Sequence, residues 1–278
     1  MNPIVVLPCH KGDFESAKSL VAWMNELHPL GGGVMFQNDY SLLIAADAVD
    51  RNELVALAET AKKSFLHVFA IQINVPPNNQ GWVKGSDYMF LKVAEWVKRY
   101  AKSPFLWMEP DAIPLKPGWR AVIFNEYANQ PYRYMGAVVR QSSQPDMPKA
   151  HLNGNAVYPN DAIDTFGKIQ AIYQGTQPFD IASAAEVVPA TFNSPLFQSF
   201  WGTPDLPPIF VKDRKADAPQ HHIDFEKFLR PDAVFFHRDK THSLIPLLRE
   251  KLNAPPVKTD LKLPNLTSQK PNPTVKTS

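Results

Sequence analysis

The strongest constraint on the fold is an alternation of short apolar runs with segments of helical periodicity. Four runs are apolar and short enough to be buried strands, and they fall at residues 4–7, 41–46, 68–75 and 105–108. Between them, apolar residues recur at helical spacing over residues 14–27, 52–63 and 86–100. Strands that alternate with helices are typical of α/β domains, so we predict an α/β domain with a mostly parallel central sheet.

Nothing in the composition divides the first 253 residues into separate domains. The chain has 278 residues, 44% of them hydrophobic, which is enough for one large core. Its second half is less regular, with strands predicted at 133–139, 152–158 and 233–236 and helices at 162–173 and 243–252. Residues 254–278 are rich in proline and lysine and contain no aromatic residue. We therefore expect one domain over residues 1–253 and a disordered tail over 254–278.

Charge, cysteine content and hydropathy exclude several classes of protein. The net charge of +2 is weaker than the basic bias of an extensive nucleic-acid surface. Cys9 is the only cysteine, so an intrachain disulfide and a cysteine-based zinc site are excluded. The amino-terminal apolar run does not resemble a signal peptide, and no apolar run has the length of a membrane span. We expect a soluble, cytoplasmic protein without a transmembrane anchor.

An acidic pair, Glu109 and Asp111, follows directly after the apolar run at 105–108. Side chains alternate along an extended chain, so the two carboxylates are expected on the same side. They repel each other there, and a hard divalent cation would relieve the repulsion. A solvated turn or a helix cap would explain the pair equally well. Carboxylate oxygens suit Mg²⁺ or Mn²⁺, which need only one or two of them when a substrate diphosphate supplies further ligands.

The predicted strand ends indicate where a ligand would bind. In an open α/β sheet, ligands bind in the crevice outside the carboxyl ends of the strands. Pro8, the segment 76–85 and the acidic pair all follow predicted strands. We therefore expect these segments to meet at one crevice.

His237 follows the last predicted strand and begins a strongly polar run that ends before the last helix. Its imidazole could supply a nitrogen ligand to the same ion, since imidazole is acceptable to Mn²⁺. Lys240 and Arg238 could hold phosphate oxygens. The alternative is a polar loop that closes onto the last helix, with Asp239 or Thr241 near the amino end of that helix.

Lys84 lies in a predicted loop, residues 79–85, that leads into the helix at 86–100. A helix amino terminus with a nearby lysine favours phosphate or another anion, although an ordinary capped loop has the same pattern. The sequence has neither a P-loop nor a dinucleotide-binding glycine fingerprint.

Two further polar segments could contact a ligand. Gly154 lies between Asn153 and Asn155, so the backbone there could approach a ligand closely, and the amides could bond to sugar hydroxyls. A simple turn is the alternative. Asp180 lies among apolar neighbours, where it could act as a general base or as the amino-terminal cap of the stretch that follows.

In the order of these features the sequence resembles the GT-A glycosyltransferases, nucleotide-diphospho-sugar transferases with a Rossmann-like domain. Four segments carry the resemblance, in the family's order, at residues 4–10, 84–115, 152–159 and 235–245. The family's Asp-x-Asp motif corresponds to Glu109-Pro110-Asp111, which keeps both carboxylates. The sequence is similar to small soluble transferases of bacteria and their phages, some of which glycosylate modified bases in DNA.

The resemblance implies a metal-dependent enzyme that transfers a sugar from a nucleotide-diphosphate sugar to an acceptor hydroxyl. Glu109, Asp111 and His237 would hold Mn²⁺ or Mg²⁺ on the diphosphate of the donor. Lys240 would assist them, and Lys84 is a further candidate for binding the donor.

The resemblance also implies roles for the two remaining segments. Asn153, Gly154 and Asn155 would line the pocket for the sugar or the acceptor. Asp180 would deprotonate the acceptor hydroxyl, as a base does in an inverting enzyme. The acceptor would be a saccharide or a hydroxylated base in phage DNA.

Two other functions stay open at this point. A nucleotidyltransferase acting on sugar phosphates can use a similar sheet and metal, but it usually has a glycine-rich basic loop near the first strand, where this chain has only Lys11 and Gly12. A non-catalytic module that binds sugar nucleotides is the second alternative. Metal-dependent turnover of the donor would exclude it.

Overall fold

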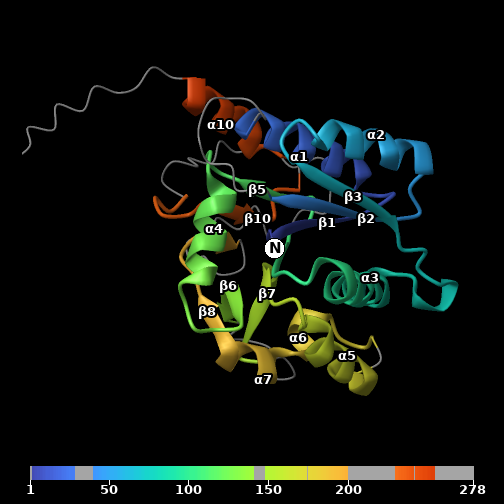
Figure 1. Ribbon diagram of the computed structural model, residues 1–278. Helices are drawn as coiled ribbons and strands as arrows, with labels where there is room; N and C mark the ends of the chain where they lie inside the picture. The colour runs from blue at the N-terminus through green and yellow to red at the C-terminus, as the bar shows by residue number, and fades with distance from the viewer. Residues whose placement is uncertain are drawn as a thin grey trace, which may run out of the picture.

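A seven-stranded sheet forms the centre of the protein in a computed structural model (Figure 1). The structure describes residues 2–28, 40–140, 148–173, 175–199, 229–240 and 242–253. The strands are β1 Ile4–His10, β2 Ser41–Asp47, β3 His67–Gln72, β4 Phe105–Trp107, β6 Tyr134–Arg140, β7 Ala150–Tyr158 and β8 Thr191–Asn193. Their order is β3-β2-β1-β4-β7-β6-β8. Only β7 is antiparallel to its neighbours β4 and β6, so the predicted mostly parallel α/β sheet is confirmed.

A second, three-stranded sheet joins distant parts of the chain. It consists of β5 Ala112–Pro114, β9 Phe197–Ser199 and β10 Phe235–His237. The strand β10 lies between the other two, antiparallel to β5 and parallel to β9. This pairing places His237 opposite Ala112, the residue that follows Asp111.

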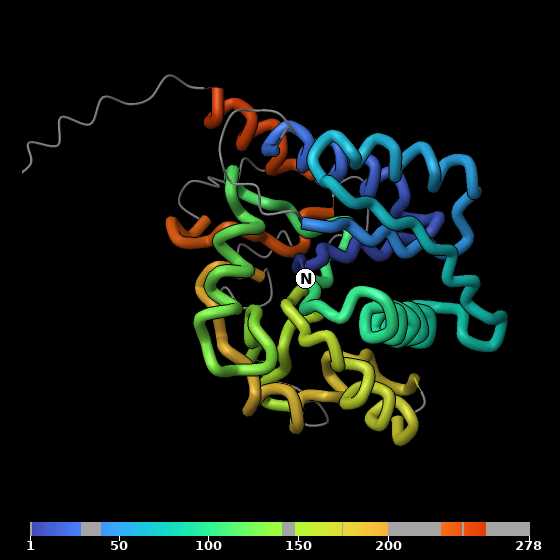
Figure 2. Tube along the Cα trace, in the orientation of Figure 1, coloured from blue at the N-terminus to red at the C-terminus, as the bar shows by residue number. Residues whose placement is uncertain are grey.

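Helices cover both faces of the large sheet (Figures 1 and 2). On one face lie α1 Phe14–Leu27, α2 Arg51–Ala61 and α10 Leu244–Asn253, and on the other lie α3 Trp82–Trp96, α5 Ala162–Tyr173 and α6 Phe179–Ala182. The remaining helical segments are α4 Trp119–Ala128, α7 Ala184–Val187, and the short turns η1 Pro77–Asn79, η2 Val97–Ala101 and η3 Val188–Ala190.

Two apolar cores follow from this layering. Along β1, Val5 and Leu7 face the core under α1 and α2, whereas Ile4 and Val6 face the core under α3. Because both faces are covered, the central strands are apolar throughout instead of alternating with polar residues. Phe90 of α3 lies at the centre of the second core, where its ring stacks on Phe179 with 4.0 Å between the ring centroids.

Several boundaries differ from the prediction. Helix α3 begins at Trp82, inside the segment expected as a loop, because Gly81 ends the preceding turn with a φ of 99° and the helix tolerates Gly85. Strand β3 ends at Gln72. Helix α4 was not expected, since its run of consecutive apolar residues lacks a clear helical period. The short strands β5, β8 and β9 were not expected either. The tail predicted at 254–278 lies outside the described residues.

A buried carboxylate joins three helices beneath the sheet. Asp87 of α3 is 3% exposed, and its oxygens accept hydrogen bonds from Phe179 N (2.8 Å) and Gln170 Nε2 (2.8 Å). Gln170 belongs to α5 and Phe179 opens α6. Burial raises the pKa of Asp87 to about 6, although both hydrogen bonds oppose the rise.

This raised pKa predicts a specific dependence of stability on pH. The folded state holds the Asp87 proton more tightly than the unfolded state, so the contribution of this group to the free energy of unfolding is greatest below the unfolded pKa and falls as pH rises through about 6. Relative to Asp87→Asn, the wild type should lose about 2 kcal/mol between roughly pH 4.5 and 7.5. Urea unfolding at both pH values measures the difference. Glu95→Gln, on the exposed side of the same helix, is the matched control, and an equal pH dependence of all three proteins would contradict the prediction.

Candidate active site

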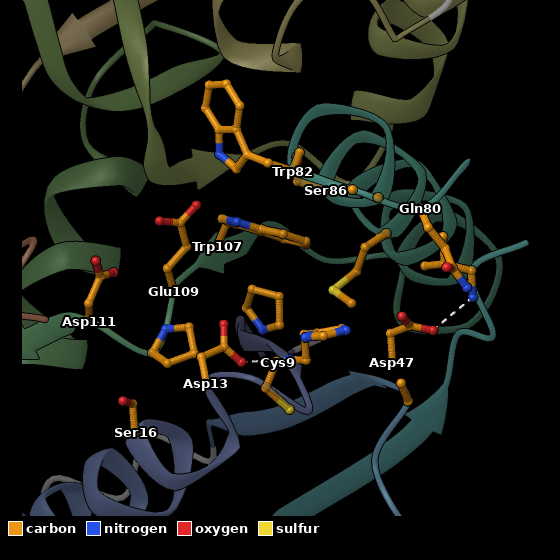
Figure 3. Close-up of a pocket in the computed structure, with 18 of the residues that line it drawn as sticks. Cys9, Asp13, Ser16, Asp47, Gln80, Trp82, Ser86, Trp107, Glu109 and Asp111 are labelled. Carbon is orange, nitrogen blue, oxygen red and sulfur yellow. Dashed lines mark hydrogen bonds between the residues drawn. The ribbon is translucent and has the colours of Figure 1, made fainter. Parts of the chain in front are cut away.

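A cleft of about 640 Å³ opens at the carboxyl ends of the parallel strands. Its walls come from the ends of β1, β2 and β4, the segment after β3 and the first turns of α3. Pro8, Gln80, Glu109 and Asp111 all line it, which confirms that the strand-end segments meet at one crevice. Figure 3 shows Glu109 and Asp111 toward one end of the cleft and Asp47 toward the other.

The acidic pair lies in the turn that joins the two sheets. Strand β4 ends at Trp107 and β5 begins at Ala112, and Ala112 N donates to Glu109 O across the turn (3.0 Å). Asn155 Oδ1 accepts from Glu109 N at 2.7 Å, which fixes the backbone of the first acid. Asp111 is 4% exposed, whereas the Glu109 side chain is partly exposed to the cleft. The turn therefore presents one buried and one accessible carboxylate.

His237 completes a cluster with these two acids. Its Nε2 lies 3.2 Å from Glu109 Oε2 and 3.5 Å from Asp111 Oδ1, and the three residues offer ligand atoms that all lie within 4.8 Å of one another. Lys240 Nζ contacts Asp111 Oδ2. Two carboxylates and one imidazole suit a divalent ion such as Mn²⁺. The residues present therefore fit a divalent cation.

The electrostatics of the cluster lead to the same conclusion. Burial alone would lower the pKa of His237, but Asp111 and Glu109 raise it to about 9. Burial alone would raise the pKa of Asp111, but His237 and Lys240 hold it well below its usual range. Both oxygens of Asp111 are buried and have no well-directed hydrogen bond among the described residues. The acids are thus held by positive charge, which a divalent cation would supply in place of the proton on His237.

Gly154 lies beside the cluster, with room for about one methyl group between its neighbours. A Cβ atom at this position of β7 would lie 3.5 Å from Phe179 Cζ, 3.7 Å from Glu109 Oε1 and 3.8 Å from Asp180 Oδ2. None of these contacts is too close, and Gly154 has no positive φ, so neither packing nor backbone requires glycine here. Glycine in a strand interior often marks the close approach of a ligand.

Asp180 lies near Gly154, in the first turn of α6. Burial raises its pKa to about 7, and the nearby carboxylate of Glu109 adds to the rise. The cap of α6 is Pro178, so Asp180 does not have the capping position considered as an alternative; its Oδ1 accepts from Ile181 N at 3.0 Å. His151 Nε2 lies 4.0 Å from Asp180 Oδ2.

The two asparagines beside Gly154 are buried and partly engaged by the protein. Asn153 Oδ1 accepts from Asn155 N (3.1 Å), and Asn155 Oδ1 holds the backbone of Glu109. The Nδ2 of Asn155 is buried and has no hydrogen-bond partner among the described residues. In this segment, the Nδ2 of Asn155 is therefore the amide that could donate a hydrogen bond to a ligand.

Lys84 lies apart from the other candidates. It belongs to the first turn of α3 and packs against Gly175, where an added Cβ would come within 3.0 Å of Lys84 Cγ. It is not among the residues that line the cleft, whereas Lys240 is.

Comparison with known proteins identifies the fold. No protein-family model matches the sequence, and a search of the curated proteins found no match. The galactosyltransferase LgtC in complex with donor and acceptor sugar analogs is 9% identical, with a TM-score of 0.53 over 91% of this chain and 98% of that chain. An active-site mutant of LgtC gives 10% identity and a TM-score of 0.54. The glycosyltransferase GlyE of Streptococcus pneumoniae TIGR4 is 6% identical in sequence, with a TM-score of 0.54 over 91% of this chain and 62% of that chain. The chain has the GT-A fold.

The cleft of this GT-A fold also includes residues that the sequence analysis missed, among them Asp13, Asp47, Trp82 and Trp107. Asp47 ends β2 as the acidic pair ends β4, so its place at a strand end was a usable signal. Trp82 was missed because the sequence analysis assigned residues 79–85 to a loop, whereas Trp82 is the first residue of α3. None of the helices in the described part of the chain has the length and apolar character needed to span a bilayer.

The cluster predicts metal binding by the protein alone. Asp111→Asn and His237→Ala should each weaken Mn²⁺ binding about tenfold or more, because each removes one of three protein ligands. Isothermal titration calorimetry measures the affinity. Asp47→Asn changes an acid of the same cleft outside the cluster and should bind Mn²⁺ as the wild type does. Unchanged affinity in both cluster variants would contradict the site.

Proposed function

We propose that this protein is a metal-dependent glycosyltransferase that uses a nucleotide-diphosphate sugar as donor. The observation that carries the proposal is the convergence of Glu109, Asp111 and His237 at the cleft of a GT-A fold. The structural neighbours support it, since LgtC has been solved with donor and acceptor sugar analogs.

The proposed metal ligands are Glu109, Asp111 and His237. A bound divalent cation would offset the negative charge that develops on the leaving diphosphate. The imidazole favours Mn²⁺ over Mg²⁺, which prefers an all-oxygen shell. Lys240 already contacts Asp111 at the edge of the cleft, so its ammonium is placed to share the charge of the diphosphate oxygens.

We place the transferred sugar in the cleft beside Glu109, on the side of Gly154 and Asp180. The amide of Asn155, which has no hydrogen-bond partner among the described residues, is close by in sequence. Asp180 is the proposed base for the acceptor hydroxyl, because its carboxyl is partly exposed and has a pKa raised to about 7, near the operating pH of a general base. Neither of the two alternative functions is favoured by an observation in the fold or the cleft. Cytoplasmic location stays a prediction.

Donor binding can be tested without knowing the acceptor. In a thermal-shift screen, one nucleotide-diphosphate sugar should raise Tm in the presence of Mn²⁺ and much less with EDTA, because a ligand that binds only the folded state stabilises it. Asp111→Asn should lose the shift, and the exposed-acid variant Asp164→Asn should keep it. A shift that is independent of Mn²⁺, or unchanged in Asp111→Asn, would contradict the proposed donor site.

Gly154 and Asp180 give a second test. Gly154→Ala should leave the free energy of unfolding within about 1 kcal/mol, since the added methyl makes only ordinary contacts. It should lower sugar transfer, because the methyl would lie 3.7 Å from Glu109 Oε1 and 3.8 Å from Asp180 Oδ2 and restrict both carboxylates. Asp180→Asn should lower transfer about a hundredfold or more while Mn²⁺ binding persists. Product formation by mass spectrometry measures both. Wild-type transfer rates in either variant would remove that residue from the site.

A further inference from the structure

The side chain of Trp82 is exposed to solvent to an extent that is unusual for a tryptophan. It is one of two tryptophans on the cleft wall; Trp107 is buried, whereas Trp82 is 80% exposed, more than any other large hydrophobic residue of the described chain. Single exposed aliphatic residues are common on proteins, but an exposed tryptophan on the wall of a cleft is a candidate contact for a ligand. Figure 3 shows its indole on the same side of the view as Trp107 and Glu109, with Asp47 on the other.

The backbone holds this tryptophan in a defined place. Gly81, with a φ of 99°, turns the chain just before it, and Trp82 is the first residue of α3. The hydroxyl of Ser86 donates to Trp82 O at 2.6 Å, and Gly85 N donates to Gly81 O at 2.8 Å. The indole is therefore attached to a rigid helix end instead of a loose loop, which lowers the entropy lost when it binds a ligand.

We propose that Trp82 is a stacking platform for a sugar ring of the acceptor, and that the acceptor is an uncharged saccharide. The inference rests on the proposed function and names the acceptor that it leaves open. The flat indole ring can pack against the apolar C–H face of a pyranose ring, while its N–H stays available to water or a hydroxyl. Gln80, Ser86 and Glu109, which line the same cleft, supply amide, hydroxyl and carboxylate groups for the ring hydroxyls.

The charge of the cleft favours a saccharide over DNA. Two of the four acids in its described lining, Glu109 and Asp111, are assigned to the metal ion, and the other two are Asp13 and Asp47. The single lysine of that lining, Lys240, already contacts Asp111. Proteins that bind DNA place lysine and arginine against the phosphates, and such contacts supply most of the non-specific affinity. Away from the metal cluster, a phosphodiester chain would meet Asp13 and Asp47, with no further lysine or arginine of the described lining to pair with its phosphates. A neutral sugar carries no such penalty.

Saturation-transfer difference NMR with lactose, maltose, cellobiose and chitobiose as probes tests the proposal in the full-length protein with Mg²⁺, which is diamagnetic, in place of Mn²⁺. At least one disaccharide should bind the wild type through its ring protons. Trp82→Ala should weaken that binding about fivefold, Trp82→Phe should retain most of it, and Trp82→Leu, which is apolar without an aromatic face, should not. Tyr100→Ala removes another exposed aromatic residue, 58% exposed, beyond the opposite end of the same helix and should bind as the wild type does.

Three results would overturn the proposal. The first is no binding of any disaccharide to the wild type, and the second is equal binding by wild type and Trp82→Ala. The third is binding of a hydroxymethylcytosine oligonucleotide that weakens steeply with salt and depends on Trp82. The thermal shift with Mn²⁺ and nucleotide sugars separates this failure from that of the proposed function. If the shift persists in Trp82→Ala while disaccharide binding is unaffected, only the acceptor platform is wrong; if the wild type shows no shift, the donor site itself is wrong.

Discussion

The pairing of β10 with β5 is the constraint on which the site depends. It sets His237 opposite Ala112 and therefore beside Asp111, although the two residues are far apart in the sequence. The backbone amides of Arg238 and Asp239 both donate to Asp111 O, at 3.1 and 2.9 Å. Arg238 has a φ of 91°, a conformation that costs a non-glycine residue about 1–3 kcal/mol. The two hydrogen bonds to Asp111 O help to offset that cost. The strained backbone at Arg238 is therefore held by the same contacts that fix Asp111 beside His237.

The segment around the end of β10 has both a structural role, at the start of α10, and a proposed chemical role, through His237. Asp239 accepts hydrogen bonds from Ser243 N and Leu244 N at the amino end of α10, at 3.0 and 2.8 Å, in line with the alternative of a polar loop that closes onto the last helix. His242 anchors the same segment through Nε2 and Pro110 O, 2.7 Å apart. The loop explanation and the ligand explanation are compatible, because they concern different residues. The cap and the anchor hold the loop while His237 faces the two acids.

On the opposite side of Glu109, the protein uses a buried acid as a structural tie. Asp87 accepts the first amide of α6 and so fixes the residue that precedes Asp180. It also adds to the negative charge near Asp180, whose pKa burial and Glu109 have already raised. The aromatic core around Phe90 and Phe179 lies beside Asp87, which is 3% exposed, whereas Asp180 is partly exposed. The raised pKa of Asp87 predicts a loss of stability at neutral pH, while its hydrogen bond gives α6 a defined position.

Local patterns were enough to predict the layered α/β fold and the place of Glu109 and Asp111. Strand and helix periodicities are properties of neighbouring residues, and ligand sites at strand ends follow from the topology of parallel sheets. The same patterns misplaced the start of α3, because two glycines beside Trp82 are as compatible with a loop as with a helix end. They also omitted α4, whose apolar residues are consecutive and show no clear period.

The sequence by itself determined the fold class and the acidic pair at the end of the fourth apolar run. His237 was a predicted third ligand, but only the tertiary structure gave the distances that bring it to this pair. Only the structure decided that Lys84 packs against Gly175 away from the cleft, and that Gly154 lies in contact range of Glu109 and Asp180. The physical reason is range. Periodicity reports on which face of its own element a side chain lies, whereas a site requires distances between elements, and those depend on strand register and packing across the whole chain.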